Sequence, residues 1–354
     1  YTVDLRQELQ EGNRSIFSRK LQELMTDRLN KGQQTILFLN RRGYAGFVSC
    51  RSCGEVMKCP HCDVSLSEHK GGRLICHYCG YTQPMPKLCP KCGSKYILGF
   101  KAGTQQIEEK LKELYPGVRT LRMDADTTRT KDSYEKILSS FANGEADVLI
   151  GTQMIVKGHD FPKVTLVGIL AADLSLNASD YRAGERTFQL LTQAVGRAGR
   201  GVLPGEAVIQ TYQPDHYAIT CAAAQDYESF YQEEILYREL SGYPPVAHML
   251  AVQIYGKEEE NAKQLALRLT DVVKSNMDFL SGKQKEQSNK KIQVLGPAPA
   301  NISKINDIYR YVFYVKHAEY DVLVEVKDRL EETLRQWQPR QMSIQFDFDP
   351  VSVL

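Results

Sequence analysis

The sequence predicts an α/β protein: a parallel-sheet domain that is interrupted by a Cys-rich insertion and followed by a smaller α+β domain. Three observations support this prediction. Short apolar runs alternate with helical patterns as far as Gln213, eight of the nine Cys lie between Cys50 and Cys92, and the order of strands and helices changes after Pro214. A chain of 354 residues is also long enough for two or three domains, each with its own core.

The parallel-sheet domain is predicted to comprise residues 1–48 and 96–213. Within it, the apolar runs indicate buried strands at 36–39, 97–100, 118–122, 146–151, 164–171 and 206–211. Helical spacing of apolar residues indicates helices at 15–30, 105–114, 131–143 and 184–198. Apolar strands interleaved with helices predict a parallel sheet that is covered on both faces.

The second domain is predicted to comprise residues 214–354. It opens with a helical stretch at 217–240, which ends at the Gly242-Tyr243-Pro244-Pro245 breaker. The pattern then predicts a strand at 249–255, a helix at 258–280, strands at 292–295 and 309–315, a helix at 318–337 and a strand at 342–348. This β-α-β-β-α-β succession is the ferredoxin-like order.

The bulk composition narrows the class of protein only slightly. Lys and Arg total 45 and Asp and Glu total 43, so binding to nucleic acid would depend on local patches and not on net charge. No apolar run approaches the roughly 20 residues that span a bilayer, and the start at Tyr1 lacks a signal sequence. We therefore expect a fragment of a cytoplasmic protein that has no membrane partner.

The insertion, residues 49–95, contains four Cys-x-x-Cys pairs. Each pair can supply half of a tetrahedral thiolate site, and Zn²⁺ is the metal that four-sulfur sites usually hold. The eight thiols predict two structural zinc ions, and both interleaved and sequential pairing fit the spacing. A thioredoxin-like redox role is a poor fit, because such motifs occur singly. The pairs are Cys50/Cys53, Cys59/Cys62, Cys76/Cys79 and Cys89/Cys92.

The octet Gln193-Ala-Val-Gly-Arg-Ala-Gly-Arg200 is the strongest functional motif. Arg197 and Arg200 are three residues apart, so on a helix they would project from the same face. Planar guanidinium groups suit the charge of a transferring γ-phosphoryl group, and Gln193 could position the phosphate or the attacking water. The octet predicts half of a nucleotide-driven motor.

A second motif, Gly151-Thr152-Gln153, follows a predicted buried strand. Small and hydroxyl residues there would let a phosphodiester backbone approach main-chain amides, and Asp160 could accept a hydrogen bond from a ribose hydroxyl. The sequence contains no P-loop and no strand that ends in paired acidic residues for Mg²⁺. We therefore expect a preceding lobe to carry those elements, and this chain to be inactive in ATP hydrolysis on its own.

Together these motifs resemble the PriA family of bacterial primosomal helicases, in superfamily 2, over essentially the whole chain. The motor motifs alone would indicate only that superfamily, whereas the Cys-rich insertion narrows the resemblance to this family. The matching stretches, besides the Cys pairs, are Phe38–Ala45, Gly103-Thr104, Gly151–Pro162, Asp180–Leu191, the octet and Gly296–Pro299.

The resemblance implies a RecA-like second helicase lobe of an ATP-dependent 3′ to 5′ DNA helicase. Such an enzyme recognises stalled or abandoned replication forks and initiates primosome assembly for replication restart. It implies forked and single-stranded DNA, single-stranded-DNA-binding protein and helicase-loading proteins as partners, in the bacterial cytoplasm at the nucleoid. ATP and Mg²⁺ would bind together with the first lobe.

The resemblance also implies roles for individual residues. Arg197, Arg200 and Gln193 would act in catalysis, and Gly158 and Asp160 would line the ATP site. Arg41, Arg42, Thr152 and Gln153 would contact DNA. One zinc would be held by Cys50, Cys53, Cys89 and Cys92, and the other by Cys59, Cys62, Cys76 and Cys79.

Two alternatives remain open from the sequence. The chain could be a non-catalytic, zinc-stabilised scaffold for docking DNA or protein, but a scaffold would have no reason to retain the octet. It could also belong to a different superfamily 2 DNA translocase, against which the Cys-rich insertion argues.

Overall fold

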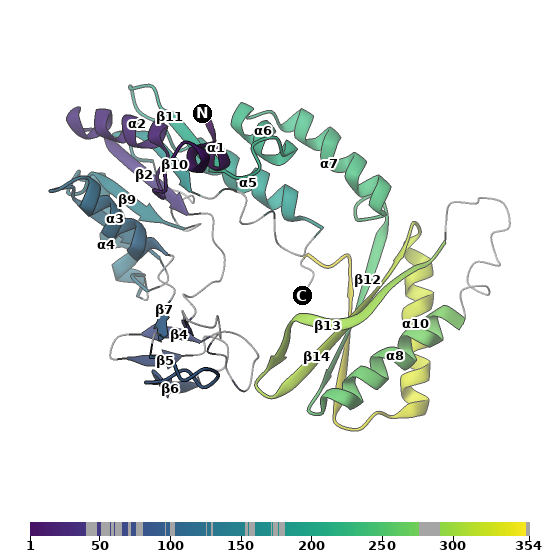
Figure 1. The fold of residues 1–354 in the computed structure, drawn as a ribbon. Helices are drawn as coiled ribbons and strands as arrows, with labels where there is room; N and C mark the ends of the chain where they lie inside the picture. The colour runs from purple at the N-terminus through teal and green to yellow at the C-terminus, as the bar shows by residue number, and fades with distance from the viewer. Residues whose placement is uncertain are drawn as a thin grey trace. The chain divides into compact units, whose positions relative to one another are not determined.

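A computed structural model describes most of the chain (Figure 1). The described residues are 1–39, 48–50, 57, 60, 66–69, 72–75, 81–95, 97–99, 103–124, 126–128, 130–152, 155, 160–170, 172, 176, 181–275 and 291–351. The chain forms two compact units, Tyr1–Gly46 with Lys101–Glu234 and Phe47–Phe100 with Ile235–Leu354. The division into three domains at residues 49, 96 and 214 stays a prediction.

The first unit contains a six-stranded sheet in which every neighbouring pair is parallel. The predicted parallel sheet is therefore confirmed. Its order is β1-β11-β10-β2-β9-β8. The strands are β1 (Thr2–Asp4), β2 (Gln34–Leu39), β8 (Thr120–Met123), β9 (Val148–Gly151), β10 (Val164–Leu170) and β11 (Glu206–Thr211).

Helices cover both faces of this sheet, as the side chains of β2 show. Ile36 and Phe38 belong to the hydrophobic core on one face, whereas Leu37 and Leu39 belong to the core on the other. This alternation follows from the two-residue period of a strand. The first core includes residues of α4 (Lys131–Ala142), α5 (Ala183–Val195) and α6 (Tyr217–Ala224), and the second includes residues of α2 (Arg19–Asn30) and α3 (Thr104–Leu114).

Three local features of this unit differ from the prediction. Helix α5 ends at Val195 and not at residue 198, because turns follow its C-cap Gly196. The predicted helix 217–240 is divided by Gln225, whose φ of 54° ends α6 before α7 (Tyr227–Ser241) begins. The short elements β1 and α1 (Leu5–Gln10) were not predicted, because their few residues show no clear hydrophobic period.

The second unit contains a four-stranded antiparallel sheet of order β13-β14-β12-β15. Its elements follow the predicted β-α-β-β-α-β order, and residues of α8 and α10 join those of the sheet in one core. Figure 1 shows both helices on the same side of the sheet. The elements are β12 (His248–Gly256), α8 (Glu259–Ser275), β13 (Gln293–Ile305), β14 (Ile308–His317), α10 (Tyr320–Trp337) and β15 (Met342–Phe348).

The described residues of the Cys-rich part of this unit include five three-residue strands. β4 (Ser67–His69), β5 (Arg73–Ile75) and β6 (Thr82–Pro84) form an antiparallel sheet. β7 (Ile97–Gly99) pairs antiparallel with β3 (Val48–Cys50), so the run predicted at 97–100 does not join the large parallel sheet. We name the buried cluster that these strands share the module core: Val48, Met57, Leu66, Leu74, Cys89 and Ile97.

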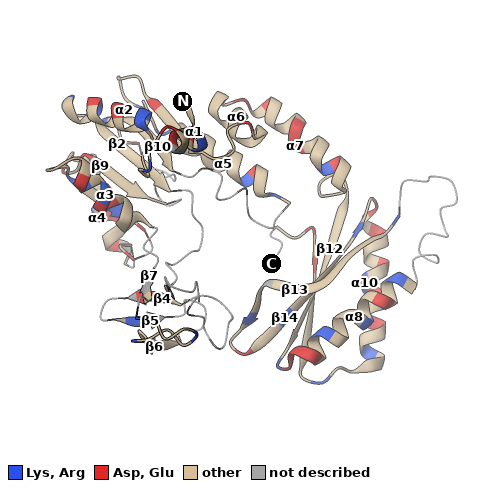
Figure 2. Ribbon diagram, viewed as in Figure 1, with Lys and Arg blue, Asp and Glu red and all other residues tan. Residues whose placement is uncertain are grey.

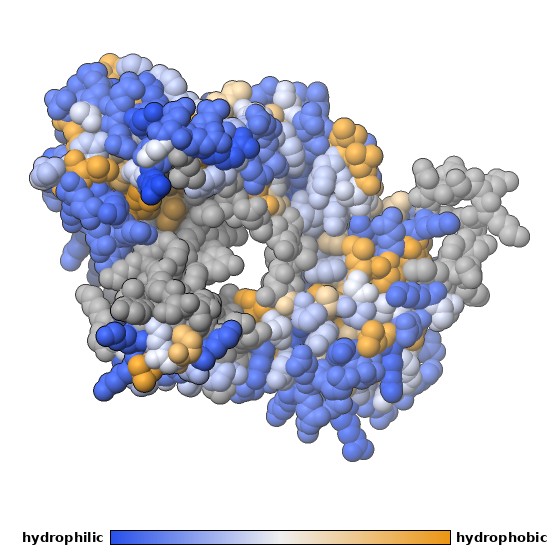
Figure 3. Space-filling model, viewed as in Figure 1, coloured by the Kyte–Doolittle hydropathy of each residue, from blue (hydrophilic) through white to orange (hydrophobic). Residues whose placement is uncertain are grey.

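Charge is spread over both units. Figure 2 shows Lys and Arg interspersed with Asp and Glu on helices such as α3, α8 and α10. The face drawn in Figure 3 is largely hydrophilic, with smaller hydrophobic groups between. This agrees with the near-neutral composition and directs attention to local sites.

Candidate nucleotide and nucleic-acid sites

Two guanidinium groups of the octet converge on one carboxylate. Arg200 Nη1 donates to Asp160 Oδ1 in a close ion pair, and Arg197 Nη1 lies 3.8 Å from the same oxygen. Arg200 Nε also donates to the carbonyl oxygen of Gly196 at 2.8 Å. The structure thus brings together three residues that the sequence analysis placed in the ATP site. Guanidinium groups bind phosphate and carboxylate oxygens well, so these two arginines are suited to an anionic ligand.

The turn that presents these arginines depends on glycine. Gly199 has a φ of +73°, and a Cβ there would lie 2.4 Å from the backbone nitrogen of Gly205. The N–H of Gly199 donates to the carbonyl of Val164 at 3.0 Å. The close approach of two chain segments therefore fixes the turn beside the first residue of β10. A side chain at Gly199 would force the segments apart.

The two arginines differ in exposure. The Arg197 side chain is 12% exposed, whereas that of Arg200 is 39% exposed. Burial and the neighbouring Arg200 guanidinium lower the pKa of Arg197, while Asp160 opposes that shift. Arg200 is thus the more accessible of the two cations, and Arg197 is the more buried one.

The other two residues predicted for the ATP site are less defined. Gln193 lies on α5 with an exposed side chain, and the described contacts place it against neither arginine nor Asp160. Gly158 lies outside the described residues. The predicted roles of both stay predictions.

Of the residues predicted to contact DNA, the described part of the chain includes Thr152, at the carboxyl ends of the strands and thus at the opposite edge of the sheet from the arginine turn. Thr152 directly follows β9, and its N–H donates to the carbonyl of Met123, the last residue of β8, at 3.4 Å. Both strands end there at their carboxyl ends. Arg41, Arg42 and Gln153 lie outside the described residues. The structure therefore places only Thr152 of this set.

The same carboxyl edge contains a polar cluster that the sequence analysis did not assign. Asp124 follows β8 and accepts hydrogen bonds from the backbone N–H groups of Asp126 and Thr127, at 3.0 and 2.9 Å. The Thr104 hydroxyl, at the start of α3, also donates to Asp124. The signal in the sequence was Gly103-Thr104 opening a helix and Asp124-Ala-Asp-Thr-Thr128 after a strand. Local turn formation accounts for the two backbone contacts, whereas the Thr104 contact joins the start of α3 to the turn.

The predicted zinc ligands are only partly covered by the structure. Cys89 is buried in the module core at 3% exposure, Cys92 is exposed, and the backbone of Cys50 forms the end of β3. Among the described residues, no group of three or more His, Cys, Asp or Glu converges as for a metal ion. The donor chemistry of four Cys-x-x-Cys pairs nevertheless fits zinc. The remaining ligands, Cys53, Cys59, Cys62, Cys76 and Cys79, lie outside the described residues.

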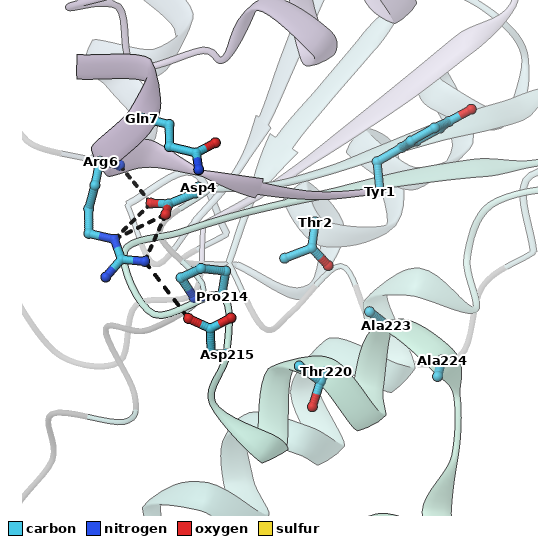
Figure 4. Close-up of a pocket in the computed structure, with 10 residues that line it drawn as sticks. All are labelled: Tyr1, Thr2, Asp4, Arg6, Gln7, Pro214, Asp215, Thr220, Ala223 and Ala224. Carbon is cyan, nitrogen blue, oxygen red and sulfur yellow. Dashed lines mark hydrogen bonds and ion pairs between the residues drawn. The ribbon is translucent and has the colours of Figure 1, made fainter. Parts of the chain in front are cut away.

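An open hollow lies near the start of the first unit (Figure 4). Its main charged groups, Arg6 and Asp4, pair with each other at 2.7 Å, and Arg6 also lies 4.0 Å from Asp215. Because these charges are mutually satisfied, the hollow offers no clear reason to bind an ion. None of the described helices is both long enough and apolar enough to cross a membrane.

Comparison with known proteins identifies the class of protein to which the chain belongs. Residues 88–202 match the model of the helicase conserved C-terminal domain. The chain therefore contains a helicase lobe, and the parallel sheet with its arginine turn belongs to that lobe. Among solved structures, the helicase domain of Hef from Pyrococcus furiosus has a TM-score of 0.27 at 18% identity, over 58% of this chain and 27% of that chain, which carries no functional argument.

The family follows from two further matches and from curated relatives. Residues 59–84 match the PriA DNA helicase Cys-rich region domain, and residues 239–351 match the Primosomal protein N C-terminal domain. Replication restart protein PriA of Bacillus subtilis (strain 168) is 44% identical over 354 residues, which cover 99% of this chain and 43% of that protein. The namesake from Synechocystis sp. is 42% identical over 356 residues, covering 99% and 41%.

The chain belongs to the PriA family of replication restart proteins, as the resemblance predicted. It spans 43% and 41% of the lengths of these two relatives, which is less than half of each. The helicase lobe, the Cys-rich region and the C-terminal domain are the parts of that family that the chain contains.

Proposed function

We propose that the chain provides the second motor lobe and the C-terminal region of an ATP-dependent 3′ to 5′ DNA helicase. In this proposal, the whole protein acts at stalled or abandoned replication forks and initiates primosome assembly. The observation that carries it is the convergence of Arg197 and Arg200 on Asp160 beside the first residue of β10. A paired, partly exposed set of guanidiniums is what charge development on a γ-phosphoryl group requires.

Arg197, Arg200 and Asp160 lie where the parallel strands begin, which we call the amino edge of the sheet. Their proposed roles follow from the exposure of their side chains. Arg200, the more accessible cation, would leave Asp160 and contact the γ-phosphate of ATP that is bound, with Mg²⁺, to the preceding lobe. Arg197 would support it from its more buried position, and Asp160 would then be available to a ribose hydroxyl. Gln193 and Gly158 would complete this site, so hydrolysis requires both lobes.

The proposed DNA site is at the carboxyl ends of the parallel strands, where Thr152 lies. The half-buried Thr152, together with Gln153, Arg41 and Arg42, would track the phosphate backbone of one strand. Asp160 belongs to the segment that follows Thr152 in sequence, so one connection between β9 and β10 would serve both ligands. This arrangement supports a coupling between the state of the bound nucleotide and the position of the bound DNA strand.

The Cys-rich part is proposed to hold two structural zinc ions. Cys50, Cys53, Cys89 and Cys92 would ligate one, and Cys59, Cys62, Cys76 and Cys79 the other. Zinc would supply cross-links that a core of this size lacks, and the burial of Cys89 in the module core supports a structural role.

The proposed partners are forked and single-stranded DNA, single-stranded-DNA-binding protein and helicase-loading proteins. We place the whole protein in the bacterial cytoplasm, at replication forks on the nucleoid. The family membership supports these assignments, and no geometry among the described residues identifies an individual protein partner.

The direct test is ATP hydrolysis by the longer protein that includes the preceding lobe, with and without forked DNA. Stimulation by forked DNA that Arg200→Ala abolishes would support the proposal. Arg6→Ala is a matched control, because Arg6 is an exposed, ion-paired arginine of the same unit. Hydrolysis that is absent, or that is insensitive to forked DNA, would contradict the motor and leave the docking scaffold as the better interpretation.

A further inference from the structure

The hairpin of β13 and β14 reaches the Cys-rich part with its tip. Ile305, the last residue of β13, packs against the module core, and Lys304 Nζ donates to the carbonyl oxygen of Pro60 at 3.1 Å. Hairpin and module belong to the same compact unit. Residues more than two hundred positions apart in sequence thus share one small core and one hydrogen bond.

The shape of the tip is suited to this contact. Asn306 and Asp307 have φ values of 50° and 60°, which give the tight turn that follows the twist of a two-stranded hairpin. Lys304 Nζ lies 3.2 Å from Asp307 Oδ1 and 4.9 Å from the centre of the Tyr309 ring. Its side chain is only 18% exposed, although it lies beside a hairpin turn. The ammonium group is therefore held in place, and it is aimed at Pro60.

The described part of the module core contains six buried residues, and the strands around it are three residues long. Short strands add little pairing, and small Cys-rich segments are commonly stabilised by metals or by neighbouring elements. Ile305 supplies such a neighbour, because its partly buried side chain packs against the module core.

We propose that the tip of the β13–β14 hairpin is an anchoring site for the Cys-rich module. Ile305 completes the module core, and Lys304 fixes Pro60 inside the Cys59-Pro60-His61-Cys62 pair. The C-terminal domain thereby determines how firmly the module keeps its structure and its metal. Lys304 and Ile305 act as positioning residues, and the inference depends on the proposed zinc sites only for one of its two readouts.

The first readout is the rate at which zinc leaves the intact chain in excess chelator. We expect Ile305→Ala to release zinc about tenfold faster than the unaltered chain, because the module core loses a packed side chain. Lys304→Gln should show a smaller acceleration. Ile308→Ala is the matched control, since Ile308 pairs with Ile305 across the hairpin but is outside the module core as described. It should change the rate less than about twofold.

The second readout is hydrogen exchange, which needs no metal. The amides of Val48, Met57 and Leu66 donate to the carbonyls of Leu66, Val48 and Met57 respectively, so their protection reports on the module. Ile305→Ala should expose these amides while β12 stays protected. The anchoring proposal would be wrong if Ile305→Ala left hydrogen exchange and zinc release unchanged, or if Ile308→Ala had effects as large as those of Ile305→Ala. If the unaltered chain holds no zinc, the zinc proposal fails, and hydrogen exchange alone then tests the anchoring proposal.

Discussion

The two edges of the parallel sheet are built in different ways. At the amino edge, long charged side chains gather around Asp160, and glycine contacts fix the turn that carries them. At the carboxyl edge, the Thr152 N–H donates to Met123 of the neighbouring strand, and Asp124 accepts from nearby backbone N–H groups. The seven residues of β10 separate the edges by roughly 20 Å. Nucleotide and DNA would therefore bind apart, and the segment between Thr152 and Asp160 connects them.

The largest effect is expected at the amino edge. In the longer protein, Arg200→Ala should lower DNA-stimulated ATP hydrolysis about a thousandfold or more, because it removes the exposed guanidinium from the γ-phosphate. Steady-state phosphate release measures this effect. Arg6→Ala should leave hydrolysis unchanged, and a similar loss in that control would show that any surface arginine suffices.

The turn itself can be tested with glycine variants. Gly199→Ala should lower the free energy of unfolding by about 2–3 kcal/mol, because it combines a left-handed backbone with a clash against Gly205. Gly117 has a φ of +89° but open space around it, so Gly117→Ala should cost only about 1 kcal/mol. Denaturant unfolding compares the two. Equal costs would mean that the close approach at Gly199 contributes nothing.

The carboxyl edge should respond more weakly. Asp124→Ala removes the acceptor of two backbone N–H groups and should cost about 1–2 kcal/mol of unfolding free energy. Asp124→Asn retains an acceptor oxygen and should recover most of this loss. Thermal unfolding of the pair measures the difference. If both variants were equally destabilised, the charge of Asp124 and not its turn would be the important property.

The smallest expected effect is the pH dependence of stability that arises from His216, a residue at neither edge of the sheet. Burial lowers the pKa of His216, against an opposing effect of Glu234, and its Nδ1 accepts from the N–H of Ala218 at the start of α6. The unfolded chain therefore binds a proton at a higher pH than the folded one. Stability should be fully present above the ordinary value of 6.5 and should decrease as the pH falls below it.

Unfolding in denaturant at a series of pH values measures this dependence. His216→Asn keeps an N-cap acceptor without a titrating ring, so its stability should vary less over the same range. An identical pH profile for the variant would remove His216 as the cause.

The sequence predicted most long elements well, because their hydrophobic periods are strong, but the strand expected at 292–295 extends as β13 to Ile305. The strands at 206–211 and 342–348 have the predicted bounds, since buried or alternating runs leave little ambiguity. The run at 97–100 was assigned to the wrong sheet. Its apolar residues fit any buried strand, and only the pairing of Ile97 with Cys50 shows where it belongs. Propensity cannot reveal such a distant partner.

The sequence indicated Arg197, Arg200 and Asp160 as separate candidates but did not indicate how the structure brings them together. The octet identified Arg197 and Arg200, and the segment after Thr152 identified Asp160. The helix assumed for the arginines ends at Val195, so their approach to Asp160 comes from a turn and not from a helical face. That turn depends on a backbone contact between Gly199 and Gly205, which no local pattern shows.

The most direct test of the separation between the edges is a paired measurement on the longer protein. DNA affinity, by fluorescence anisotropy, and DNA-stimulated ATP hydrolysis would be compared for Arg200→Ala and Thr152→Val. The account predicts that Arg200→Ala loses hydrolysis at nearly unchanged DNA affinity, whereas Thr152→Val weakens DNA binding and retains hydrolysis at saturating DNA. If both variants lowered both properties in parallel, the assignment of nucleotide and DNA to opposite edges would be wrong.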